Sequence, residues 1–223
     1  MNNRYAVKRC SQAVSIDADW NKSCWQTVEP LSVKVPNWQP AGSQPLPQTE
    51  VKVQYDDAHL YVIFRVSDYY VTALTTQTHG PVYKDSCVEF FFSPACGRPD
   101  SYFNIETNCC GVLLAQHHTG PRQNSRFLDI ADCRQIQIAG TVSGPIRQEI
   151  AKPMTWVVEY AVPLEILLHY TAIDKPAPVV CWRGNFYKCA DGCSRPHWIS
   201  WLPIPSDIPD FHRPDCFGLL EFM

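Results

Sequence analysis

Short runs of alternating apolar and polar residues, separated by turn residues, constrain the fold of this chain more than any other feature. In residues 60–67, every second side chain is apolar and falls on one face of an extended strand: Leu60, Val62, Phe64 and Val66. Residues 51–55 alternate in the same way. The segment 56–59 between them, Asp-Asp-Ala-His, is typical of a tight turn. The pattern therefore predicts a β-hairpin.

Eight further runs have strand character and recur at the spacing typical of a β-sandwich. They are residues 87–92, 102–107, 112–116, 136–141, 156–162, 185–189, 198–201 and 219–222. Only Pro163–Tyr170 reads as a short helix, with Pro at its first position. We predict an all-β chain, an antiparallel β-sandwich of immunoglobulin-like or jelly-roll-like type with one short helix. The Pro-rich stretches 36–47 and 203–214 are expected to be ordered loops of a single domain over residues 1–223.

Composition and charge exclude several classes of function. The 223 residues include 19 Lys and Arg against 22 Asp and Glu, and a net charge of −3 gives no basis for binding nucleic acid. The apolar stretch 157–168 is interrupted by Glu159, Pro163 and Glu165, so we expect no membrane span. The N-terminal residues lack the apolar stretch of a signal peptide. We expect a cytoplasmic protein, or a secreted or periplasmic one if a leader has been removed.

The eleven cysteines cannot all pair, because their number is odd. Cys87 and Cys181 lie in segments with the appearance of strands, where a free thiol behaves as a small apolar side chain, so we expect reduced and mostly buried thiols. A zinc site from Cys181, Cys189, Cys193 and His197 is the alternative. Its spacing lacks the closely paired cysteines of structural zinc sites, so we expect no metal ligand there.

Two of the predicted strands carry polar side chains opposite an apolar face. In residues 87–92, Glu89 points away from the face that is formed by Val88, Phe90 and Phe92. In residues 102–107, Asn104 and Glu106 share such a polar face. Carboxylates and amides in this arrangement can hydrogen-bond the hydroxyl groups of a ligand. We expect Glu89 to be half-exposed there, and the alternative is that all three are ordinary solvated positions.

A series of motifs along the chain resembles a known family. In order they are Tyr55–Val62, Val66–Asp68, Tyr83–Phe91, Tyr102–Ile105, Ile199–Trp201, Phe211–Pro214 and Phe217–Leu220. Their order and spacing resemble those of carbohydrate-binding module family 9 and its DOMON-like relatives, over most of the chain.

The resemblance implies a non-catalytic sandwich that holds a mono- or oligosaccharide end between two aromatic side chains. Such a domain is usually an accessory module of a glycoside hydrolase and supports carbohydrate catabolism. The two aromatic positions fall on Tyr83 and Phe211, and neither is the usual Trp. The binding Glu of the family falls on Glu89, and a frequent Arg falls near Asn104, so that an amide replaces a charge. We therefore expect Tyr83, Glu89, Asn104 and Phe211 to bind the ligand, with no catalytic residue.

Two other functions stay open at this point. A glycoside hydrolase needs two carboxyl groups about 5–9.5 Å apart. Asp85 and Glu89 would be about 13 Å apart along one strand, but Glu89 and Glu106 on neighbouring strands can reach such a distance. The second alternative is a DOMON-like domain that binds a protein or a haem, the haem through Met154 and one of His117, His118 and His212.

No cofactor is expected, and calcium is a further alternative. Asp56, Asp57 and Asp68 are the carboxylates that would bind calcium. Carboxylates of this kind are more often turn formers, because their oxygens accept hydrogen bonds from nearby backbone N–H groups.

Overall fold

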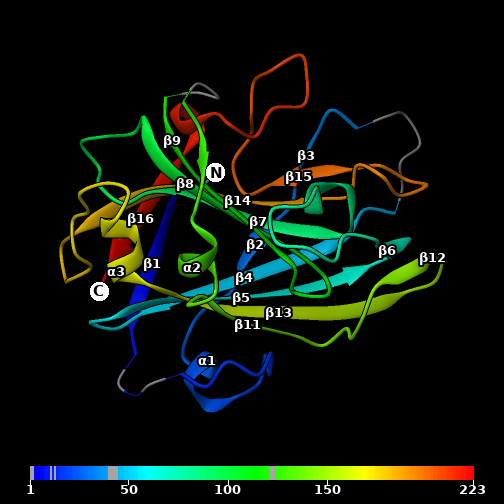
Figure 1. Ribbon diagram of the computed structural model, residues 1–223, viewed down its shortest axis with the longest axis horizontal. Coiled ribbons are helices and arrows are strands. Elements are labelled where there is room, and N and C mark those ends of the chain that lie inside the picture. Colours follow the sequence, from blue (N-terminus) through cyan, green and yellow to red (C-terminus); the bar gives the residue numbers. More distant parts are fainter. Residues whose placement is uncertain (1–2, 11, 13, 40–44, 121–123) are drawn as a thin grey trace.

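A computed structural model describes residues 3–10, 12, 14–39, 45–120 and 124–223, and Figure 1 shows two β-layers packed face to face. The first, the β7 layer, runs in the order β10 (Arg126–Phe127), β9 (Leu113–Thr119), β8 (Ser101–Asn108), β7 (Cys87–Ser93), β14 (Cys181–Cys189), β16 (Gly218–Phe222) and β1 (Arg4–Arg9). β15 (Trp198–Ser200) pairs with β14, and β3 (Val35–Asn37) pairs with β15.

The second layer, the β5 layer, begins where the first ends. It runs in the order β1, β4 (Gln48–Tyr55), β5 (His59–Asp68), β13 (Met154–Pro163) and β11 (Gln137–Gly140), with β2 (Leu31–Val33) paired to β4. β6 (Val71–Ala73) and β12 (Ile146–Ile150) form a separate antiparallel pair. β1 belongs to both layers, because residues 4–7 pair with β16 and residues 8–9 pair with β4.

The predicted all-β sandwich is confirmed, with differences in detail. All ten predicted strands are present, but β1, β2, β3, β6, β10 and β12 were not predicted. The predicted helix is α3 (Leu164–Leu168). The structure adds α1 (Ser23–Gln26) and α2 (Ile130–Cys133), as well as the 3-10 turns η1 (Val82–Lys84) and η2 (Pro214–Cys216). Four-residue helices leave no periodicity in a sequence. No helix in the described part of the chain is long and apolar enough to cross a membrane.

The turn between β4 and β5 forms as its sequence predicts. Asp56 Oδ1 accepts hydrogen bonds from the backbone N–H groups of Ala58 and His59, both at 2.7 Å. Asp57 pairs instead with Arg9 across the exposed surface at 2.6 Å. The turn fixes the register of the hairpin, and with it the side chains that face the second layer.

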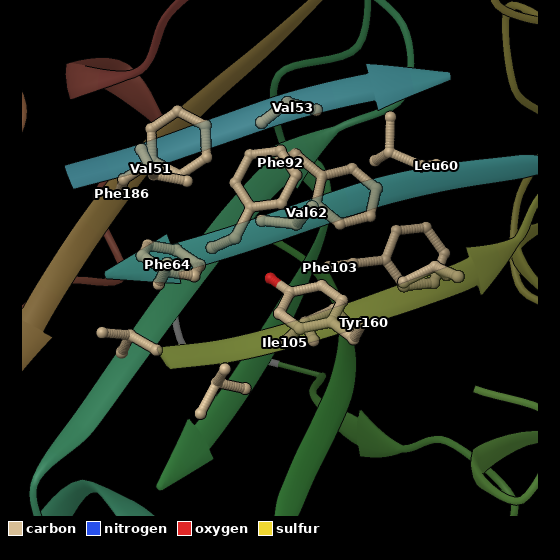
Figure 2. Close-up of a cluster of buried hydrophobic side chains, with 14 of the residues drawn as sticks. Val51, Val53, Leu60, Val62, Phe64, Phe92, Phe103, Ile105, Tyr160 and Phe186 are labelled. Atoms are coloured by element: carbon tan, nitrogen blue, oxygen red, sulfur yellow. The ribbon is translucent and has the colours of Figure 1, made fainter. Parts of the chain in front are cut away.

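The core fills the space between the two layers (Figure 2). Alternate residues of β7 and β5 point into it, so that Phe90, Phe92 and Phe64 are fully buried. Phe90 stacks on Phe186 of β14, with ring centroids 4.5 Å apart. Each such aromatic side chain contributes about 1.5–3 kcal/mol by leaving water. Since Val88, Phe90 and Phe92 face this core, Glu89 must face the outer side of the β7 layer, as predicted.

Different segments cover the two outer faces (Figure 1). The N-terminal segment 14–28, which contains α1, packs on the β5 layer through Trp20 and Trp25. The Pro-rich loop 203–213 packs on the β7 layer through Ile204 and Phe211. The other predicted Pro-rich loop begins within β3, and its residues 40–44 lie outside the described residues.

One disulfide corrects the prediction for Cys181. Cys181 is bonded to Cys96, and nine cysteines are free. The pairing of Ser93 with Arg183 brings these two cysteines together at the end of the β7–β14 ladder, although 85 residues separate them in sequence. The register of β7 against β14 cannot be inferred from local sequence patterns, so the disulfide could not be predicted from them.

The zinc set is not brought together. Cys193 Sγ is 3.3 Å from the carbonyl of Ala190, and His197 Nε2 is 2.8 Å from Lys188 Nζ. Because Cys181 is in a disulfide, these four side chains do not form the tetrahedral set that zinc requires. The expectation that none of the four binds a metal stays a prediction.

Candidate functional site

A pocket of about 410 Å³ opens on the outer face of the β7 layer. Its floor is made by outward-facing residues of β7, β8 and β9, namely Glu89, Phe91, Glu106, Leu114, Gln116 and His118. Its walls come from η1, the β14–β15 connection with the first residue of β15, the residue after β3 and the 203–213 loop. Four aromatic rings line these walls: Trp38, Tyr83, Trp198 and Phe211.

The register of the strands places two carboxylates side by side in the floor. Glu89 of β7 is directly opposite Glu106 of β8. Side chains at opposed antiparallel positions have Cβ atoms about 4.5–5.5 Å apart. Glu89 is only 3% exposed and Glu106 5% exposed, so the expectation of a half-exposed Glu89 is wrong. The aromatic walls remove most of its solvent contact.

Burial perturbs both carboxyl groups. Loss of hydration raises the pKa of Glu106 to about 7, although its hydrogen bond from Asn104 acts in the opposite direction. Loss of hydration also holds the pKa of Glu89 well above its usual range, and the neighbouring Cys189 and Glu106 add to that shift. The pair therefore favours holding a proton near neutral pH, when no ligand supplies hydrogen-bond donors.

Asn104 lies beneath the pocket and organises its floor. It is fully buried, does not line the pocket, and donates through Nδ2 to Glu106 Oε1 at 2.7 Å and to Gln116 Oε1 at 3.3 Å. Its Oδ1 therefore faces His118, whose Nε2 is 2.8 Å away and must carry the hydrogen. Burial lowers the pKa of His118 to about 3, so this imidazole is neutral and its Nδ1 is an acceptor.

Two acceptor atoms of the floor are left without a partner. Among the described residues, neither Glu106 Oε2 nor His118 Nδ1 has a hydrogen-bond donor within reach, and both are buried. A buried acceptor without a donor costs about 1–3 kcal/mol. A ligand that brings hydroxyl or N–H groups into the pocket would remove that cost.

The aromatic walls differ in how much ring surface they offer. Tyr83 is 38% exposed, whereas Phe211 is 9% exposed and stacks on Tyr187 with centroids 4.2 Å apart. Trp198 is half-buried and donates from Nε1 to Asp191 at 2.8 Å. Trp38 lies 5.7 Å from the Phe211 ring. Ring surface on several sides of one cavity suits a flat apolar ligand face.

The structure thus brings together three of the four predicted ligand-binding residues, Tyr83, Glu89 and Phe211, in one pocket, with Asn104 directly behind it. Trp38 and Trp198 were missed as pocket residues. Trp198 falls in the predicted strand 198–201, but nothing in that local pattern separates it, as a pocket residue, from the buried Trp201. Trp38 gave no signal in the sequence, because it enters the site only through the pairing of β3 with β15.

The alternative metal and haem residues do not meet. Asp56 precedes β5 and Asp68 ends it, so that a ten-residue strand of roughly 30 Å separates them. Asp68 instead forms a buried ion pair with Lys188 at 3.2 Å. Met154 belongs to β13 of the β5 layer, whereas His117 and His118 belong to β9 of the β7 layer, and His212 packs on His118.

Residues 15–222 match the family described as carbohydrate-binding family 9. The chain belongs to this family. Family 9 proteins are carbohydrate-binding modules, so this chain is a non-catalytic carbohydrate-binding protein, and the glycan-processing enzyme is set aside. The resemblance seen in the sequence motifs is confirmed. Among curated proteins, none matches this chain in sequence.

Solved structures share the fold of this chain. A Bacteroides uniformis protein described as carbohydrate-binding is 26% identical, with a TM-score of 0.87 over 99% of both chains. A family 9 module from Caldicellulosiruptor kristjanssonii in complex with glucose is 16% identical, with a TM-score of 0.66 over 99% of this chain and 95% of that one. The same module in complex with cellotriose has a TM-score of 0.66, again at 16% identity, over 98% and 93%.

Proposed function

We propose that the pocket on the β7 layer is where this family 9 protein binds the end of a mono- or oligosaccharide, in support of polysaccharide catabolism. The observation that carries the proposal is the pair of buried acceptors without donors, Glu106 Oε2 and His118 Nδ1, in a pocket walled by aromatic rings. A pyranose supplies hydroxyl donors at its edge and a C–H face that stacks on aromatic rings.

Each predicted residue has a distinct part in this proposal. Tyr83 offers an exposed ring face for stacking, and Phe211 contributes the edge of a ring that is already held by Tyr187. Glu89 accepts hydrogen bonds from sugar hydroxyls, and such charge-assisted bonds are roughly twice as strong as neutral ones. Asn104 acts indirectly, because it fixes the positions of Glu106 and His118.

The charge of the pocket narrows the class of sugar. Four carboxylates line it, those of Glu89, Glu106, Asp191 and Asp210, and no Lys or Arg of the described residues does. A uronic acid or sulfated sugar would place its anion beside these groups. Neutral sugars are therefore the expected ligands, and the glucose and cellotriose held by the Caldicellulosiruptor kristjanssonii module are the first to test.

Calorimetric titration with glucose, cellotriose and glucuronate tests the proposal. We expect binding of a neutral sugar, and a loss of about 1.5–3 kcal/mol in affinity for Glu89→Gln, which is a factor of roughly 10 to 150. The matched control is Glu50→Gln, which changes a carboxylate of the β5 layer that pairs with Arg65 away from the pocket. If Glu89→Gln binds the sugar as the wild type does, the site is elsewhere.

A further inference from the structure

Two cysteines and Glu89 form a compact group beneath the pocket. Cys87 of β7 and Cys189 of β14 are directly opposite each other in the ladder, and Glu89 lies two residues along β7 on the same face. One ligand atom of each, the two Sγ atoms and a carboxylate oxygen, lies within 4.8 Å of the others. Cys189 Sγ is only 3.0 Å from Glu89 Oε1.

The surroundings of this group favour a cation. All three side chains are buried. Two further carboxyl groups, those of Glu106 and Asp191, lie near Glu89. Glu106 also brings its unpartnered Oε2 to the same floor. In the described part of the chain, no other three metal-binding side chains come this close together.

We propose that Cys87, Cys189 and Glu89 bind a thiophilic divalent cation such as Zn²⁺ at the base of the pocket. Two thiolates and a carboxylate are ligands that zinc accepts, and three protein ligands leave a fourth position for water or another oxygen. Zinc–sulfur distances of about 2.3 Å and zinc–oxygen distances of about 2.1 Å place tetrahedral ligand atoms about 3.6–3.8 Å apart. The observed group needs only small side-chain movements to reach that spacing.

The binding step exchanges protons for the metal. Each thiol gives up its proton to solvent, as does Glu89 where it holds one, so that two thiolates and a carboxylate bind the metal and the hydrogen bond from Cys189 to Glu89 is lost. The fourth position faces the pocket, because Cys189 and Glu89 both line it. This site differs from the zinc set weighed in the sequence and shares only Cys189 with it.

Titration of the reduced protein with Co²⁺ under anaerobic conditions tests the proposal. We expect one equivalent to produce a thiolate-to-cobalt charge-transfer band and the visible bands of a tetrahedral ion, and Zn²⁺ to abolish both. Cys189→Ser should remove the charge-transfer band or reduce it by half or more. Cys193→Ser, which changes a buried free cysteine outside the group, should leave it unchanged.

Glu89→Gln keeps both thiols and is the second variant, in case a Cys→Ser change prevents folding. We expect it to weaken Co²⁺ binding at least about tenfold. No charge-transfer band with the wild type, or the same band and affinity in Cys189→Ser and Glu89→Gln, would overturn the metal site. Sugar binding by the metal-free protein is measured separately, so that failure of the metal site leaves the sugar proposal intact.

Discussion

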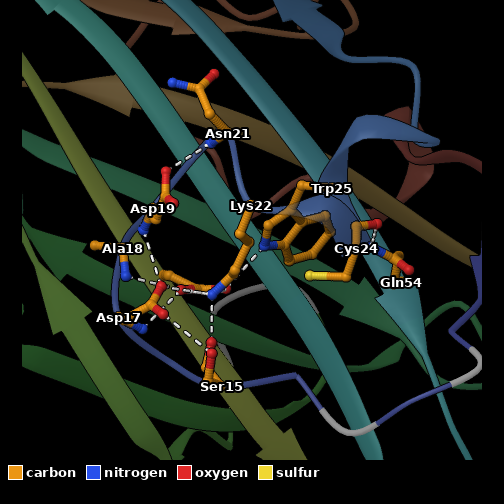
Figure 3. Close-up of polar contacts among 10 residues, drawn as sticks. Ser15, Asp17, Ala18, Asp19, Asn21, Lys22, Cys24, Trp25 and Gln54 are labelled. Atoms are coloured by element: carbon orange, nitrogen blue, oxygen red, sulfur yellow. Dashed lines mark hydrogen bonds and ion pairs between the residues drawn. The ribbon is translucent and has the colours of Figure 1, made fainter.

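The two outer faces of the sandwich both bury carboxylates, but they supply them with very different numbers of hydrogen-bond donors. On the β5 layer, Glu159 is fully buried under the N-terminal segment. It accepts from the backbone N–H groups of Asp17 and Ala18, from Trp25 Nε1 at 2.8 Å and from Lys22 Nζ at 2.6 Å. Figure 3 shows these four residues, with Asp17, Ala18 and Lys22 on the loop before α1 and Trp25 on α1 itself.

On the β7 layer, Glu89 and Glu106 are almost as deeply buried but have fewer donors. Glu106 receives one hydrogen bond, from Asn104, and its second oxygen has no partner among the described residues. Glu89 receives a weak bond from the Cys189 thiol. A buried carboxylate with all its acceptors occupied holds a structure together. One that is left short of donors is ready for a ligand.

Among the substitutions proposed here, removal of the Glu159 carboxylate should have the largest effect on the stability of the protein. Glu159→Ala leaves Lys22 and three N–H donors without their acceptor, so we expect a loss of about 3–5 kcal/mol in the free energy of unfolding. Chemical denaturation measures this loss. Glu221→Ala, which removes an exposed partner of Arg4, should cost at most about 1 kcal/mol. Equal effects of the two substitutions would mean that the N-terminal segment does not depend on Glu159.

Glu106→Gln should change the pH dependence of stability. The pKa of Glu106 is about 7 in the folded protein against an ordinary value of 4.5, so the folded state holds this proton more tightly than the unfolded state. The stability that protonated Glu106 confers is therefore fully present below pH 4.5 and falls as the pH rises from 4.5 to 7. It is absent above pH 7. The total is about 3 kcal/mol.

Denaturation curves between pH 4 and pH 8 measure this effect. The Glu106→Gln variant should show a flatter profile than the wild type over that window, and should be the more stable of the two at pH 8. A Glu106→Gln profile that is parallel to that of the wild type would show that the carboxyl ionises normally, and the contrast with Glu159 would disappear.

Tyr83→Ala should have the smallest effect of the three. It removes one exposed stacking surface, so we expect a loss of about 1–2 kcal/mol in sugar affinity and a change below about 0.5 kcal/mol in stability. Phe211→Ala should lower stability as well, because Phe211 stacks on Tyr187. Calorimetry and thermal melts separate the two readouts. Tyr69→Ala, an aromatic change outside the pocket, is the control, and a loss of affinity equal to that of Tyr83→Ala would argue against stacking.

Much of the fold and part of the site could be predicted, because they depend on local alternation. The period-two pattern is enough to place Phe90 and Glu89 on opposite faces of β7. The Asp-rich turn is enough to define the β4–β5 hairpin. The family motifs then led to Tyr83 and Phe211. In each case the signal lies within about ten residues of the chain.

The parts of the fold and of the site that were not predicted depend on pairing between distant segments, and local sequence patterns do not contain that information. β1 is only six residues long and four of its side chains are exposed, so its pattern is weak until its partners are known. Asn104 looks like a ligand-binding residue in the strand pattern, but the register with His118 and Glu106 turns its amide into an internal support. The Cys96–Cys181 bond depends in the same way on the β7–β14 ladder.

The position of β1 has a consequence for how the protein is made in the cell. Residues 4–7 pair in parallel with residues 219–222, which are synthesised much later than they are. β16 lies between β14 and β1, so the β7 layer has a gap until translation has delivered it. The nascent chain must therefore keep two strand edges open until β16 has been made, which exposes it to wrong pairing and to chaperones. By its topology, this sandwich cannot complete its fold before β16 has left the ribosome.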